Sequence, residues 1–239
     1  MSWRRIRAIF RKELREYRRN GAIIATMAVL PVIFVIEPLI QIFNLPAASA
    51  HTLLHKDPLL YMLGIPALVP AALAAYAVVG ERQQGTLEPV LTTPIRREEL
   101  LLAKALAVLV PALVISYALF VVSIVAIALF ADSAVASAVL RAPQLIAQVV
   151  FTPLIAGWSI WVGIGISART NDTRVAQQLS VLASLPTVVV TALIAFGVIH
   201  PSLKLALGLG IALLVLDRLG WRFVSALFDR ERLITGTRS

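Results

Sequence analysis

Long apolar stretches alternate with short polar ones along almost the whole chain. A helix that crosses a membrane needs about 20 mostly apolar residues. Six stretches meet this measure, at residues 21–44, 58–80, 101–130, 145–167, 176–198 and 203–220. The pattern therefore predicts an all-α integral membrane protein with six transmembrane helices. Only the residues HPSLK separate the last two stretches, so a broken or re-entrant segment there is an alternative.

The third stretch is longer than a bilayer requires. Its 30 residues, 101–130, would reach about 45 Å as a helix. We expect this helix to tilt, to kink at Pro111 or to project beyond the membrane.

The first 20 residues have a different pattern, in which basic residues surround a regular apolar stripe. The apolar residues recur every three or four positions, at Trp3, Ile6, Phe10, Leu14 and Tyr17. This spacing predicts an amphipathic helix at the membrane interface, with its cations toward anionic lipid. Two roles are open: a topological anchor, or a connecting helix packed beside a cytoplasmic partner.

Composition supports a membrane protein with one domain. Hydrophobic residues make up 59% of the 239 residues and charged residues 15%, and the mean hydropathy is +0.86. Soluble domains carry about 25% charged residues. We predict a single transmembrane domain over 1–239, with an interfacial helix at 1–20, a bundle at 21–220 and a cytoplasmic tail at 221–239.

The basic residues predict the orientation of the chain. Cytoplasmic segments of membrane proteins are enriched in Lys and Arg. With the N-terminus inside, all of the 22 Lys and Arg residues except Lys56, Arg141 and Lys204 fall in cytoplasmic segments. Both termini are therefore expected in the cytoplasm. This distribution also explains the net charge of +9 without nucleic acid.

The chain lacks the residue patterns of an enzyme. It has no cysteine, and no G-x-x-x-x-G-K-[ST] loop that would cradle the phosphates of ATP. His51 and His55 have helical spacing, but a structural zinc needs further ligands and Asp57 is the only acid nearby. Glu98 and Glu99 fit the first turn of a helix, where acids are favourable. We predict no catalytic residue, no bound cofactor and no metal in this chain.

Glu37 lies inside the first apolar stretch, where a carboxylate is costly and usually functional or paired. Gln41 follows one helical turn later on the same face. Three interpretations remain open: a polar stripe facing a dimer seam or substrate path, a structural hydrogen bond to a neighbouring helix, and a neutralised acid without a role.

A polar segment, GERQQGTLEPVLTTPIRREELLLAK, interrupts the chain between the second and third stretches. Gly85 permits a sharp turn, and Thr86 can cap a short helix with Glu88 and Pro89 in its first turn. That helix would have an apolar edge of Leu87, Val90 and Leu91. The segment has about 20 residues where a simple helix connection takes about 2–8. The extra length implies a docking surface.

This segment resembles the type-2 family of ATP-binding cassette (ABC) transporter permeases, an export family. The similar positions are Glu81, Gly85 to Glu88, Leu91 to Pro94, Arg97, Glu98 and Lys104. The N-terminal helix, six spans and the terminal FDRERL are similar in layout. Arg96 departs from the family, which often has a small capping residue there, so the third helix has an alternative start at Thr93.

The resemblance implies the permease subunit of an exporter in a prokaryotic inner membrane. Two permease chains, as a homodimer or a heterodimer, would pair with two separate ATPase subunits that carry the ATP and magnesium. The implied contact with the ATPase is formed by Glu81, Gly85, Thr86, Leu87, Glu88, Pro89, Val90, Leu91, Thr92 and Thr93. Glu37 and Gln41 are then candidates for the substrate path or dimer seam.

A stand-alone secondary transporter is the alternative function. Glu37 would be its proton- or cation-coupling acid. The short chain and the lack of a visible inverted repeat count against this class.

Overall fold

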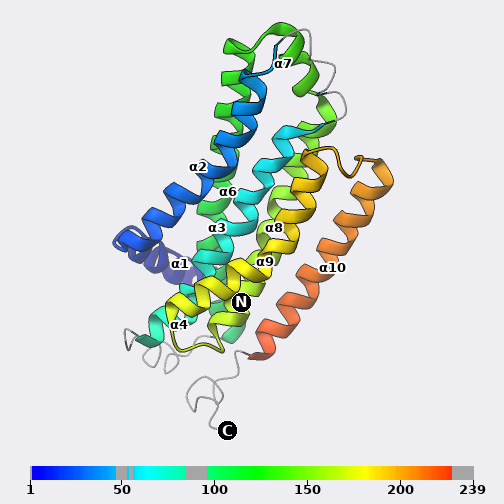
Figure 1. Ribbon diagram of the computed structural model, residues 1–239. Helices are drawn as coiled ribbons and strands as arrows, with labels where there is room; N and C mark the ends of the chain where they lie inside the picture. Colours follow the sequence, from blue (N-terminus) through cyan, green and yellow to red (C-terminus); the bar gives the residue numbers. More distant parts are fainter. Residues whose placement is uncertain (1, 47–52, 54–55, 84, 86–95, 228–239) are drawn as a thin grey trace.

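The structure is a computed structural model that describes residues 2–46, 53, 56–83, 85 and 96–227 (Figure 1). These residues form helices joined by short connections, and none of them lies in a strand. The elements are α1 (Trp3–Tyr17), α2 (Gly21–Phe43), η2 (Pro58–Leu63), α3 (Gly64–Ala74), α4 (Tyr76–Gln83), α6 (Arg97–Phe130), α7 (Ser133–Val139), α8 (Ala142–Ser167), α9 (Thr173–Ala195) and α10 (Leu203–Leu227). The all-α prediction is confirmed for the described part of the chain.

Capping side chains fix where two of the long helices begin. The Asn20 side chain accepts hydrogen bonds from the backbone N–H groups of Ala22 and Ile23, at 3.0 and 3.3 Å. Asp172 does the same for α9, at 2.7 and 3.1 Å. Such residues satisfy amides that have no partner inside the helix. The first and fifth apolar stretches therefore become helices at these caps.

Five segments of the described chain have the length and apolar composition to cross a membrane. They are Gly21–Phe43, Pro58–Gln83, Arg97–Phe130, Ala142–Ser167 and Thr173–Ala195. They agree with the first five predicted stretches. The sixth stretch forms α10, a helix of 25 residues that includes Lys204, Asp217, Arg218 and Arg222 and is not among these five. α10 therefore extends seven residues into 221–239, the segment predicted as a cytoplasmic tail.

Two uncertainties of the sequence pattern are resolved by helix continuity. α6 is one helix of 34 residues, which corresponds to about 51 Å, so the length in excess of the bilayer is real. α9 and α10 are continuous helices of 23 and 25 residues. The connection between them is therefore a turn between two helices, each of which is unbroken.

The second predicted span lies at the centre of the bundle. In Figure 1 the cyan α3 runs between α2, α6, α8 and α9, and it packs against all four. In the most apolar part of the second span, Pro58–Gln83, 94% of the residues are buried, against 22% in the corresponding parts of α2 and α6. Small residues make this possible, because Ala and Gly allow helix backbones to approach closely in a membrane.

Gly163 shows how close the central contact is. A methyl group placed on Gly163 of α8 would lie 2.6 Å from the Ala74 Cβ and 2.9 Å from the Ala71 carbonyl oxygen. Both neighbouring groups belong to α3, and one of them is backbone that cannot move aside. The contact of α3 with α8 therefore depends on the absence of a side chain at this position.

We expect Gly163→Ala to destabilise the protein by about 1–3 kcal/mol, because overpacking forces the two helices apart. The matched control is Gly210→Ala, since a methyl group at Gly210 meets nothing within 4 Å. The control should be neutral or slightly stabilising, because Ala favours helix over Gly. Thermal unfolding of both variants in detergent tests this, and equal unfolding temperatures would contradict it.

Candidate functional site

The polar segment between α4 and α6 is described only at its two ends. Thr86 to Thr93, the predicted contact with an ATPase, lie outside the described residues. Gly85 is described and has a backbone φ of +67°, a left-handed conformation that favours glycine. Its N–H donates to the Arg82 carbonyl at 3.2 Å, so the chain turns directly after α4. At the other end α6 begins at Arg97 with Arg96 as its N-cap, which excludes the alternative start at Thr93.

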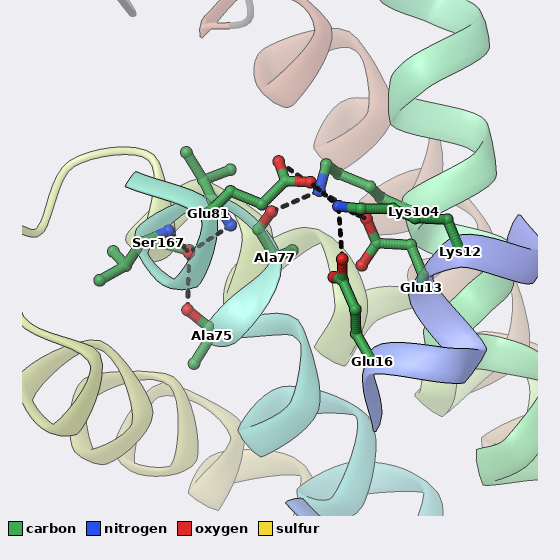
Figure 2. Close-up of polar contacts among 10 residues, drawn as sticks. Lys12, Glu13, Glu16, Ala75, Ala77, Glu81, Lys104 and Ser167 are labelled. Carbon is green, nitrogen blue, oxygen red and sulfur yellow. Dashed lines mark hydrogen bonds and ion pairs between the residues drawn. The ribbon is translucent and has the colours of Figure 1, made fainter. Parts of the chain in front are cut away.

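A buried lysine joins the two ends of this segment. The Lys104 side chain of α6 is fully buried. Its Nζ lies 2.8 Å from Glu81 Oε2 of α4 and 3.0 Å from Glu13 Oε1 of α1 (Figure 2). It also donates to the Ala77 carbonyl at 2.7 Å. Three helices thus share one ammonium group. We use the name Lys104 cluster for Lys104 and the four residues around it: Lys12, Glu13, Glu16 and Glu81.

Lys12 completes the cluster from α1. Its Nζ lies 2.6 Å from Glu81 Oε1 and 3.1 Å from Glu16 Oε1. Burial lowers the pKa of the Lys12 ammonium, but the hydrogen bond and charge of Glu81 outweigh this and raise that pKa overall. Burial raises the pKa of the Glu13 carboxyl, and the positive charge of Lys104 opposes the rise. Glu81 therefore holds one lysine from each of two helices.

α1 packs on α6 through a mixed face. The predicted stripe is buried at Ile6 and Tyr17, whereas Trp3 is 72% exposed. Glu13 is only 3% exposed and shares the buried face with Ile6 and Tyr17. A helix held only by lipid would place such an acid in water. The partner of α1 in the structure is therefore its own chain.

A second contact ties α1 to the start of α6. Glu99 Oε1 accepts a hydrogen bond from the Ser2 backbone N–H at 2.6 Å. Its Oε2 lies 3.5 Å from the Arg5 guanidinium and accepts from the Arg96 backbone N–H at 3.4 Å. One carboxylate therefore caps α6 and fixes the first turn of α1. The expectation that Glu99 suits a first helical turn is confirmed.

Arg82, next to Glu81, connects α4 to the turn between α8 and α9. Its guanidinium donates to the Thr170 carbonyl at 3.0 Å and to the Asn171 side chain at 2.9 Å. The Gln83 side chain donates to the Asn171 carbonyl at 3.2 Å. Adjacent residues of α4 thus bind in two directions: Glu81 toward α1 and α6, and Arg82 toward α8 and α9.

Ser167 interrupts the helix between α3 and α4. Its Oγ accepts from the backbone N–H groups of Val78 and Val79, both at 3.1 Å, and donates to the Ala75 carbonyl at 2.6 Å (Figure 2). A side chain inserted into the helical hydrogen-bond ladder is a common cause of a break. All three backbone groups stay satisfied, as burial requires. α4 is therefore a separate short helix held by polar side chains.

The structure does not bring Glu37 and Gln41 to the Lys104 cluster. Gln41 Nε2 donates to Glu37 Oε1 within α2, which confirms that the two residues share a face. Among the described residues, Glu37 Oε2 is buried without a hydrogen-bond partner. One turn away, Phe34 stacks on Tyr61 with ring centroids 5.2 Å apart, and Tyr61 on Phe196 at 5.7 Å. Because Glu37 and Gln41 both belong to α2, their hydrogen bond does not join α2 to a neighbouring helix.

Sequence reasoning missed the acids and bases of α1. The sequence pattern of the first 20 residues shows basic residues around an apolar stripe and does not single out Lys12, Glu13 or Glu16. One signal was present: Lys104 falls inside the apolar stretch 101–130, and a charge there requires a partner. The identity of that partner depends on contacts across 91 positions of sequence.

We expect Lys104→Met to destabilise the protein by about 3–5 kcal/mol, because the buried carboxylates of Glu13 and Glu81 would keep only the partly exposed Lys12 as a cation. Replacing all three residues, as Lys104→Met with Glu13→Leu and Glu81→Gln, should restore most of the loss. Arg15→Met removes an exposed cation of α1 and should change stability by less than about 1 kcal/mol. Thermal unfolding in detergent measures all three. A single variant as stable as the triple variant would contradict this account.

Comparison with known proteins identifies one family. The family described as "ABC-2 family transporter protein" matches residues 7–210 of the 239. No protein with curated annotation shows significant similarity to the chain. The matched range includes the Lys104 cluster and both ends of the polar segment. It agrees with the resemblance found in the sequence and gives no support to a stand-alone secondary transporter.

Proposed function

This chain belongs to the ABC-2 family of transporters, and on that premise we propose that it is the permease subunit of an exporter. The family implies an ABC ATPase as partner. We propose that ATP is hydrolysed on that separate subunit, which docks on residues 86–93. ATP-driven movement of the partner would then reach the membrane helices through the two ends of this segment.

The observation that carries this proposal is the position of α4. Glu81 and Arg82 bind α1, α6 and the turn after α8, within five residues of the docking segment. A push on the segment would therefore move α4 and the start of α6 together, since Lys104 joins them. The break between α3 and α4 would let α4 change its angle to α3, while the N–H groups of Val78 and Val79 stay bonded to Ser167.

We propose that α10 is the sixth span and that both termini lie in the cytoplasm. Residues 205–216 of α10 are free of charge; Lys204 precedes them, and Asp217, Arg218 and Arg222 follow. Twenty-five residues correspond to about 38 Å, more than the hydrocarbon thickness of about 30 Å. The connection from α9 lies at the end of the bundle opposite α1 (Figure 1).

We further propose a dimer of this chain with two ATPase subunits in a prokaryotic inner membrane. α2, α6 and α9 expose rows of large apolar side chains. On α2 these include Val29, Ile33, Ile36 and Ile40, which flank Glu37. A second chain on this face would shield the Glu37 carboxylate from lipid, so we place the substrate path or dimer seam here.

Leu87→Asp and Leu91→Asp test the docking segment. A charge on the apolar edge would be desolvated in a protein interface, which is costly. We expect loss of the co-purifying ATPase subunit and of its stimulated activity, with normal membrane insertion. Ser137→Asp places the same charge on an exposed position of α7, at the opposite end, and should leave both unchanged. Full stimulation in the Leu87 and Leu91 variants would refute docking at this segment.

Arg82→Gln tests transmission separately from docking. The change removes the bonds to Thr170 and Asn171 but leaves residues 86–93 intact. We expect the ATPase subunit to bind normally, while transport per ATP hydrolysed falls at least about tenfold, a loss equivalent to one charge-assisted hydrogen bond. Purified complexes in vesicles allow both quantities to be measured. Wild-type coupling would exclude the turn after α8 from the path of transmission.

A further inference from the structure

An apolar cavity of about 340 Å³ lies between α8, α9 and α10. α10 packs mainly on α8, so the cavity forms where α9 and α10 diverge. Its walls include Phe151, Val190, Leu205, Leu209 and Leu213, and its few polar groups are hydroxyls. An apolar cavity does not hold water. In a membrane, the available occupant of such a space is hydrocarbon.

The length of the cavity matches one leaflet. Its lining residues extend over 147–158 on α8, 183–194 on α9 and 205–216 on α10. Each range covers eleven steps, or about 16 Å of helix. Half of the hydrocarbon core is about 15 Å thick. The cavity therefore has the depth of one acyl chain that enters from the membrane surface.

The mouth of the cavity carries a suitable charge. Pro201 and Ser202 line the end where α9 connects to α10, and Lys204 is exposed beside them. A lysine at the level of lipid headgroups attracts anionic lipid. The opposite end reaches Trp158 and Leu216. Asp217 follows there, and a methyl group placed on Gly157 of α8 would lie 2.9 Å from its Oδ1, so the cation lies at the α9–α10 connection and the acid lies at the far end.

We propose that this cavity, called the groove between α9 and α10 below, is a binding site for one acyl chain of an anionic phospholipid. The lipid belongs to the leaflet on the side of the α9–α10 connection, and its phosphate faces Lys204. This site requires the proposed placement of α10 in the membrane but not the coupling to an ATPase. The ligand completes the packing of α10, which protein side chains leave incomplete.

The test uses the full chain in vesicles that contain phosphatidylglycerol with a photoreactive diazirine midway along one acyl chain. After illumination, mass spectrometry locates the adducts. We expect them on residues 183–194 and 205–216, facing the groove. Adducts spread evenly over exposed positions of α2 and α6, or cross-links between two copies through this face, would overturn the proposal.

Filling the groove provides the matched comparison. Ala206→Phe on α10 should reduce labelling about tenfold, the effect of excluding about two methylene groups from apolar burial. Ala183→Phe tests the opposite wall and replaces the first variant if that one misfolds. Ala128→Phe makes the same change at an exposed position of α6 and should label as wild type. Unchanged labelling in both groove variants would overturn the site.

Lys204→Gln tests the headgroup. We expect wild type to label more strongly with phosphatidylglycerol than with phosphatidylcholine carrying the same diazirine, and the variant to lose this preference. A preference that survives in the variant would overturn the role of Lys204. Because no ATPase is present, these results are independent of docking at residues 86–93.

Discussion

The structure depends on the burial of the Lys104 ammonium group. A charge removed from water is stable only when paired and fully hydrogen-bonded. Here the partners are the carboxylates of Glu13 and Glu81 and the Ala77 carbonyl. They come from α1 and α4, so neither helix can leave α6 without exposing a buried ion to an apolar surrounding. One side chain thereby fixes the relative positions of three helices.

The remainder of the bundle is built around this fixed point by close packing. α3 continues from α4 into the centre and packs on α8 at Gly163, where no side chain fits. Ser167 lies four residues later on α8. Its hydroxyl oxygen accepts hydrogen bonds from the backbone N–H groups of Val78 and Val79, which follow the break between α3 and α4. The same helix therefore provides a close packing contact with α3 and the polar group that permits the bend. Precise packing and local freedom lie within about one turn of each other.

The five helices that are long and apolar enough to cross a membrane could be predicted from the sequence, because hydropathy is a local property. Caps such as Asn20 and Asp172 then set the helix starts within a few residues of the apolar stretches. The pairing of Glu13 with Lys104 could not be predicted, since it depends on how α1 crosses α6. The amphipathic stripe of α1 predicts a helix at the membrane interface, and nothing in that pattern distinguishes Glu13 from the charged residues around it. The cavity between α9 and α10 also follows from helix divergence, which no single segment encodes.

The Lys104 cluster also fits the proposal that an ATPase subunit moves this chain through α4. A helix held only by apolar contacts and headgroups can slide by small steps with little change in free energy. A shift of α1 by one turn, about 5.4 Å, would separate Glu13 from Lys104 and Lys12 from Glu81. The loss of such buried pairs costs several kcal/mol. Displacement of α4 would therefore carry α1 and α6 with it, and little of the movement would be lost at their contacts.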